Sequence, residues 1–105
     1  MNDVQVIQKN DGEKIQWEQN DFVLSFDSDA LAVNCSRYQK DWPVHLDICR
    51  DGSGNLSIGT AGATHYVAEI DIPATTYTPG NSEEDPPVAD PLNMGDVTLT
   101  LWAIS

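Results

Sequence analysis

The sequence predicts an all-β fold, either an antiparallel β-sandwich or a flattened barrel of about eight short strands. Apolar and polar residues alternate with a period of two in short segments, which is the pattern of half-buried strands. Clusters of Asp, Asn, Gly and Pro separate these segments, as turns require. Twelve of the 17 acidic residues are Asp, which disfavours helices. At 105 residues, the chain has the length of a single β domain covering residues 1–105.

The first half of the chain predicts two hairpins. In each, two alternating segments flank residues that tolerate a positive φ angle. Their inward positions carry aliphatic or aromatic side chains, so both hairpins should contribute to one core. The first joins residues 4–6 to 15–17 through a turn at 10–13, and the second joins 22–26 to 31–35 through a turn at 27–29.

Residues 36–42 lose the alternation and run into Pro43, which predicts a loop or a single helical turn. A third hairpin follows, with strands at 44–48 and 56–58 around the turn residues 51–55. The next strand covers 66–72 and ends at Pro73, because proline cannot donate to a β-ladder.

The composition changes between residue 73 and residue 96. Residues 79–95 combine prolines and acidic residues with few apolar side chains, so we expect a mobile acidic Pro-rich loop. This loop is either a contact arm or dispensable. Alternation returns in the last strand, residues 97–105.

The last strand is apolar on both sides at its end. Val97, Leu99 and Leu101 share one side, whereas the other side ends in an aromatic and an aliphatic residue. Because one face of each sheet in a small sandwich normally meets solvent, we expect a partner chain to cover this second side. The interface candidates are residues on this second side of the last strand, together with an aromatic residue beside Pro43 that we expect to be exposed. They are Trp102, Ile104, Thr100 and Trp42.

Two sequence segments resemble ion sites without completing one. Residues 51–55 open like a calcium loop, but Leu56 replaces the glycine expected at the sixth position and Gly62 the glutamate expected at the twelfth, so a hairpin turn is preferred. His45, Asp47 and Cys49 share one side of a strand, and His65 could approach from the next strand. Residues two apart on a strand are separated by roughly 6.5 to 7 Å, and His45 and Cys49 are four apart. They therefore lie too far apart to share one metal unless the strand bends.

Catalytic chemistry finds no support in these motifs. Asp47, Glu69 and Asp71 project opposite to the apolar residues of their strands, where acids normally serve solubility. Neither a phosphate-binding loop nor a nucleophile elbow is present. We therefore expect no enzyme activity, no catalytic residue, no cofactor and no metal, while ion binding by the two segments above stays open.

The net charge, the cysteines and the absence of a targeting signal limit the expected partners and cellular compartment of the protein. The formal net charge of -12 excludes nucleic-acid binding by counterion release. The sequence contains no secretion signal and no apolar run near the ~18 residues that span a membrane, so we expect a cytoplasmic protein or one within an assembled particle. Cys35 and Cys49 should then be reduced, with Cys35 facing inward and Cys49 outward by their phase.

The sequence favours a non-catalytic structural module that associates with itself or with another protein through its Pro-rich loop and last strand. Such compact, cofactor-free modules occur in phage particles. One alternative is a carbohydrate-binding module that stacks its ligand on Trp42, Tyr38 or Tyr77. Another is an acidic mimic of nucleic acid that occupies the groove of a basic enzyme.

Overall fold

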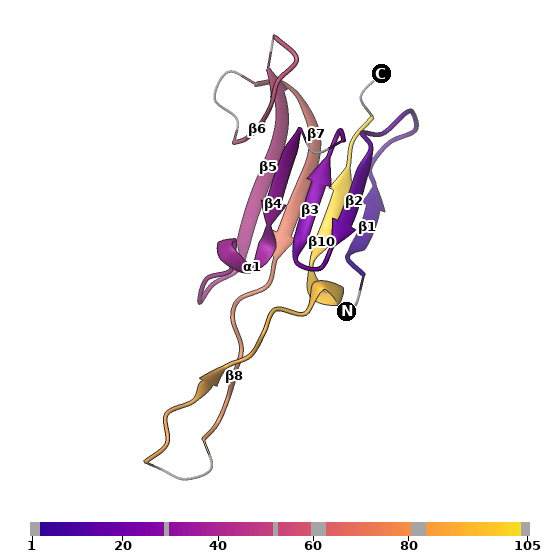
Figure 1. The fold of residues 1–105 in the computed structure, drawn as a ribbon. Coiled ribbons are helices and arrows are strands. Elements are labelled where there is room, and N and C mark those ends of the chain that lie inside the picture. Colours follow the sequence, from indigo (N-terminus) through magenta and orange to yellow (C-terminus); the bar gives the residue numbers. More distant parts are fainter. Residues whose placement is uncertain (1–2, 29, 52, 60–62, 81–83, 104–105) are drawn as a thin grey trace.

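The all-β class is confirmed by a computed structural model, which describes residues 3–28, 30–51, 53–59, 63–80 and 84–103. Over these residues the chain forms ten strands in three sheets, one α-helix and one 3-10 helix. The two larger sheets form the body of the molecule, and a ribbon projects from one end of it (Figure 1). The longest extent is 55 Å, against 26 and 22 Å across.

The larger sheet has five strands in the order β1-β10-β7-β5-β6. All neighbours run antiparallel except β1 and β10, which are parallel. The last strand of the sequence therefore lies inside the sheet, with a neighbour on each side. The strands are β1 (Gln5–Gln8), β5 (Val44–Asp51), β6 (Leu56–Ile58), β7 (Ala63–Ile72) and β10 (Thr98–Leu101).

The smaller sheet lies over one face of the larger one (Figure 1) and has the order β2-β3-β4. Its strands are β2 (Trp17–Asn20), β3 (Val23–Phe26) and β4 (Leu31–Asn34). Both sheets supply side chains to one core, because on each strand alternate residues face the other sheet. The fully buried large residues include Leu24, Phe26, Val33, Ile48, Ile70, Ile72 and Leu99.

The second and third hairpins are confirmed. In the second, β3 and β4 pair antiparallel, and Asp27 and Ser28 both adopt φ 54° in the turn. In the third, β5 pairs with β6, and the Asp51 carboxylate accepts the backbone N–H groups of Ser53 (2.9 Å) and Asn55 (3.0 Å). Asp51 thus closes a hairpin turn, as the sequence indicates.

The first predicted hairpin is wrong. Strand β1 pairs parallel with β10 from the far end of the chain, with Gln5 N–H bonded to the carbonyl of Val97 and Lys9 N–H to that of Leu101. Strand β2 instead joins β3 in the other sheet, through a tight turn where Asp21 has φ 55°. A pairing between the two ends of a chain leaves no local turn signal, so alternation alone assigned β1 to its sequence neighbour.

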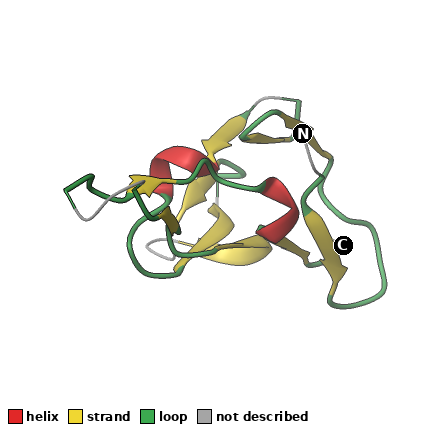
Figure 2. Ribbon diagram, turned by 90° about the horizontal axis from the view of Figure 1, so that it is seen from below, coloured by secondary structure: helices red, strands yellow, loops and turns green. Residues whose placement is uncertain are grey.

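Two further boundaries are confirmed. A single helical turn, α1 (Cys35–Tyr38), occupies the segment before Pro43, and its N-cap Asn34 accepts the N–H of Ser36 at 3.1 Å. Strand β7 ends at Ile72, directly before Pro73. Figure 2 shows α1 and the 3-10 helix η1 (Met94–Asp96) as short helices among the strands.

The predicted loop 79–95 has different bounds. A two-stranded ribbon of β8 (Tyr77–Thr78) and β9 (Val88–Ala89) opens before Pro79, and these two short strands raise the count above eight. Near its other end, Leu92 and Met94 are buried in the core, so the excursion ends before them. We call the described residues 74–80 and 84–91 the arm. Its mobility stays a prediction.

Both cysteines are buried and free. Cys35 belongs to the core cluster, and burial raises the pKa of its thiol to about 11. Cys49 lies outside that cluster, as its phase predicts, but it is not exposed. Neighbouring strands flank Cys49 on both sides, with Ser57 on β6 and Tyr66 on β7, which alternation within β5 does not reveal. None of the described helices is long and apolar enough to span a membrane.

Candidate functional site

Four polar side chains meet on the face of the larger sheet that points away from the smaller sheet. The antiparallel register of β5 and β7 places His45 opposite Asp71 and Asp47 opposite Glu69. Because alternate residues of a strand share a face, the two pairs form adjacent rows on one side. The apolar residues between them, such as Ile70, face the core instead. We call these four residues the His45 cluster.

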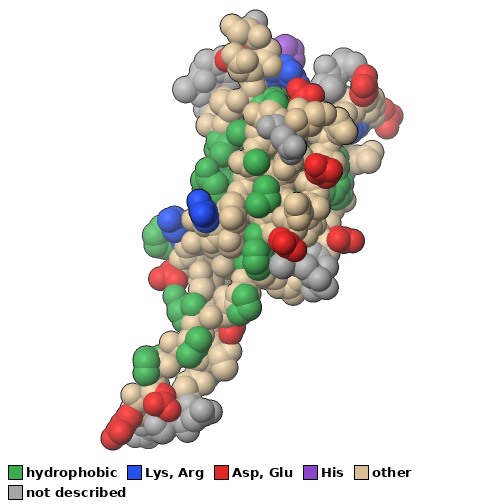
Figure 3. Space-filling model, viewed as in Figure 1, with side chains coloured by type: hydrophobic (Ala, Val, Ile, Leu, Met, Phe, Trp, Pro, Cys, Tyr) green, Lys and Arg blue, Asp and Glu red, His purple; other side chains and the backbone are tan. Residues whose placement is uncertain are grey.

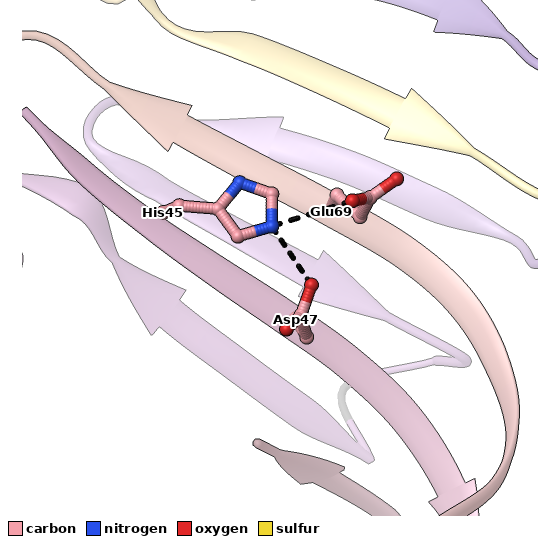
Figure 4. Close-up of side chains that lie close together, drawn as sticks. All are labelled: His45, Asp47 and Glu69. Carbon is pink, nitrogen blue, oxygen red and sulfur yellow. Dashed lines mark hydrogen bonds and ion pairs between the residues drawn. The ribbon is translucent and has the colours of Figure 1, made fainter. Parts of the chain in front are cut away.

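The imidazole ring of His45 lies among three carboxylates. Its Nδ1 is 2.6 Å from Asp71 Oδ1, and its Nε2 is 2.8 Å from Asp47 Oδ1 and 3.3 Å from Glu69 Oε1. Figure 4 shows the ring directed at Asp47 and Glu69, with the two interactions of Nε2 drawn as dashed lines. The side chain of His45 remains 46% exposed, so water reaches the cluster.

This arrangement raises the pKa of His45 above its usual value of 6.5. The hydrogen bond to Asp71 contributes most, while partial burial opposes the shift and the hydrogen bond to Asp47 adds to it. The physical reason is that both ring nitrogens face carboxylate oxygens. Both can donate only when the ring is protonated, so the cationic form is favoured.

In metal-free protein, we therefore expect nuclear magnetic resonance titration to give His45 a pKa above 6.5. Asp71→Asn should lower this pKa, because it removes the largest favourable interaction. A folded-state pKa above the unfolded value contributes stability that is fully present below pH 6.5 and is lost as the pH rises through the folded pKa. Urea unfolding across this pH range should show that loss, and the Asp71→Asn variant should show less of it.

Glu18→Gln serves as the control, since Glu18 is exposed on β2, in the smaller sheet, whereas the His45 cluster lies on the larger sheet. It should leave the His45 titration unchanged. A His45 pKa at or below 6.5, or one that Asp71→Asn does not move, would contradict the geometry described above.

The sequence stripe of His45, Asp47 and Cys49 contributes only two members to this cluster. The donor atoms of His45, Asp47 and Glu69 all lie within 4.8 Å of one another, and Cys49 is not part of that group. The spacing argument against Cys49 therefore agrees with the structure. Asp71 and Glu69 join from β7, which only the cross-strand register reveals. Alternation within the strand predicts that Asp71 and Glu69 face outward, but it does not predict that His45 lies beside them.

The interface candidates have different surroundings. Thr100 is 5% exposed and offers little surface to a partner, because β10 lies between β1 and β7. Trp102 is half-buried, and its indole Nε1 donates to Glu69 Oε2 at 2.7 Å, so the ring is held by its own chain. Trp42 is 61% exposed. Ile104 lies outside the described residues.

Two of the aromatic residues nominated for ligand stacking lie at, or next in sequence to, the contact between the arm and the body, which we call the root of the arm. The Tyr77 hydroxyl donates to Asp41 Oδ1, next to Trp42 in the chain, and Tyr77 is 49% exposed. This hydrogen bond raises the pKa of Tyr77. Tyr38, in contrast, packs partly buried against the core. Sequence reasoning could not join Asp41 to Tyr77, because they are 36 positions apart in the chain.

Comparisons with known proteins add no family or relative. No protein-family model, no curated protein and no solved structure matches this chain.

Proposed function

We propose that this protein is a non-catalytic assembly module and that it associates with copies of itself through its arm. The observation that carries the proposal is the projection of the arm beyond the two-sheet body (Figure 1). The ribbon strands contribute no residue to the core cluster. Such an extension adds nothing to the core cluster of its own body, whereas a second chain would gain an extended surface to bind.

The surface of the arm is suited to protein contact. Val88 is 65% exposed and Tyr77 49% exposed, and Pro79, Pro86 and Pro87 are exposed as well. Figure 3 shows hydrophobic side chains along the arm and acidic side chains at its far end. Apolar and aromatic groups in the middle with charges at the rim are the usual composition of an interface.

The sequence also shapes the arm. The Asp90 carboxylate accepts hydrogen bonds from the hydroxyls of Thr76 (2.8 Å) and Thr78 (2.5 Å), which join the two halves of the ribbon and lower the pKa of Asp90. Further out, a Cβ on Gly80 would lie 2.5 Å from the Asp85 carbonyl oxygen, so only glycine fits there. The bonds of Asp90 limit the conformations of the ribbon at the end nearest the body, which reduces the entropy lost when that part binds a partner.

The test is a chain with a shortened arm. Thr76 and Asp90 face each other, with the Asp90 N–H bonded to the Thr76 carbonyl at 2.8 Å, so an Asn-Gly turn can replace residues 77–89. Sedimentation velocity at micromolar concentrations should show the full chain as an oligomer and the shortened chain as a monomer with the same circular dichroism. The Val88→Glu variant should weaken association in the same direction.

Val6→Glu is the matched control, because Val6 is 42% exposed on β1 and the variant introduces the same charge away from the arm. It should leave the oligomer intact. A full chain that is monomeric at every concentration, or an oligomer that survives removal of the arm, would overturn the proposal.

We propose carbohydrate binding at the root of the arm as the second candidate, favoured by the exposed Trp42 and by Tyr77 beside Asp41. Aromatic faces next to a carboxylate are suited to stacking and hydrogen bonding a sugar. A glycan array and tryptophan fluorescence of the wild type and Trp42→Ala test this function. Absence of a response in both experiments would exclude it.

A further inference from the structure

Three donor atoms of the His45 cluster have the spacing of metal ligands. A tetrahedral ion holds N and O ligands about 2.0 to 2.2 Å away, which places the ligand atoms about 3.3 Å apart. His45 Nε2 lies 2.8 Å from Asp47 Oδ1 and 3.3 Å from Glu69 Oε1, and the three atoms fall within 4.8 Å of one another. Small side-chain rotations therefore suffice for all three to reach one ion.

Groups outside this donor set orient two of its members. Asp71 Oδ1 lies 2.6 Å from His45 Nδ1 and accepts a hydrogen bond from the Nδ1–H group, which leaves Nε2 directed at Asp47 and Glu69. A carboxylate behind a ligating histidine is the usual arrangement in metal sites. Independently, the indole of Trp102 donates to Glu69 Oε2 at 2.7 Å and leaves Oε1 facing the histidine. Both outer contacts thus hold the three donor atoms toward a common point.

We propose that His45, Asp47 and Glu69 bind one transition-metal dication of the zinc class, with Asp71 as the positioning residue behind His45. An imidazole with two carboxylates suits Zn²⁺ and Co²⁺, whereas Mg²⁺ and Ca²⁺ prefer oxygen ligands alone. The ion replaces the proton on His45 Nε2, and that proton leaves to solvent. The formal charge of -12 favours the approach of a dication, and the partial exposure of the histidine leaves room for a water ligand.

The site does not depend on the proposed assembly function, since all its residues lie on β5, β7 and the chain just after β10. The experiment is a calorimetric titration of the chelator-treated full-length chain with ZnCl₂, followed by Co²⁺ absorption spectroscopy. We expect one ion per chain and a cobalt spectrum typical of nitrogen and oxygen ligands. The His45→Asn variant should lose more than about 100-fold in affinity, and Asp71→Asn about 10- to 100-fold.

His65→Asn is the matched control, because it removes the other histidine of the chain, which lies opposite Arg50, away from the donor set. It should bind Zn²⁺ as the wild type does. The Zn²⁺ affinity that Asp71→Asn loses should be largely present in the Asp71→Glu variant, because glutamate keeps the carboxylate. A loss of affinity caused only by disturbed packing would not be rescued in this way. Circular dichroism of each variant verifies the fold.

Three results would overturn the proposal. One is the absence of saturable binding at one equivalent. Another is unchanged affinity in the His45→Asn variant. The third is a thiolate-to-cobalt charge-transfer band, which would place the ion at Cys49 instead of the carboxylates.

Discussion

Replacing Phe26 by alanine is expected to lower the free energy of unfolding by about 3 to 5 kcal/mol. Phe26 is fully buried at the end of β3, where it contributes to the core that both sheets share. Truncation removes its contacts and leaves a cavity that two hydrogen-bonded sheets cannot close easily. Since domains of this size are stable by about 5 to 15 kcal/mol, the loss takes a large share of the total. Urea denaturation with a fixed m-value measures it.

Val6→Ala provides the comparison, since Val6 is 42% exposed on β1, away from both the core and the arm. It should change the free energy of unfolding by less than about 0.5 kcal/mol. A cost below about 1 kcal/mol for Phe26→Ala would mean that the two sheets do not share a packed core.

The Thr100→Asp variant is expected to be destabilised by more than about 3 kcal/mol. Alternation alone places Thr100 on the outward side of the last strand, where the sequence predicts a contact with a partner chain. In the structure it is 5% exposed and lies opposite Glu69 on β7. A new carboxylate would lose its hydration there and lie beside an acid of the same sign. Thermal and urea unfolding of the chain with the shortened arm, which we expect to be monomeric, measure the change without a contribution from association.

Thr100→Val separates the effect of a new charge from that of any substitution at this position, because it is close in size to threonine and uncharged. We expect it to change the free energy of unfolding by less than about 1 kcal/mol. If Thr100→Asp unfolds no more readily than the wild type, the outer face of β10 is open in the free chain and available to a partner.

Local patterns predicted the elements that local interactions form. The alternation around residues 22–35 and the turn residues between its two halves were sufficient to predict the hairpin of β3 and β4. Pro43 and Pro73 marked the ends of segments correctly, because proline acts on its own neighbours. The all-β class follows from the same short-range preferences, which do not depend on which strands become partners.

The His45 cluster could be predicted only in part. The sequence placed His45, Asp47 and the acids of β7 on outward faces, and the spacing rule set Cys49 apart from His45. It could not predict that Asp71 faces one ring nitrogen and Glu69 the other, because both come from β7. The register between β5 and β7 decides these contacts, and a shift of one residue would have separated them.

The sequence by itself thus determined the all-β class, the turns of the second and third hairpins, and the apolar side of the strands that these hairpins join. Only the tertiary structure decided that β1 joins β10 in parallel, that Cys49 and Thr100 are buried, and that part of the Pro-rich segment forms a ribbon. The reason is that a side-chain period of two fixes a residue's face within its own strand. What covers that face depends on which strands lie beside it, and those come from distant parts of the chain.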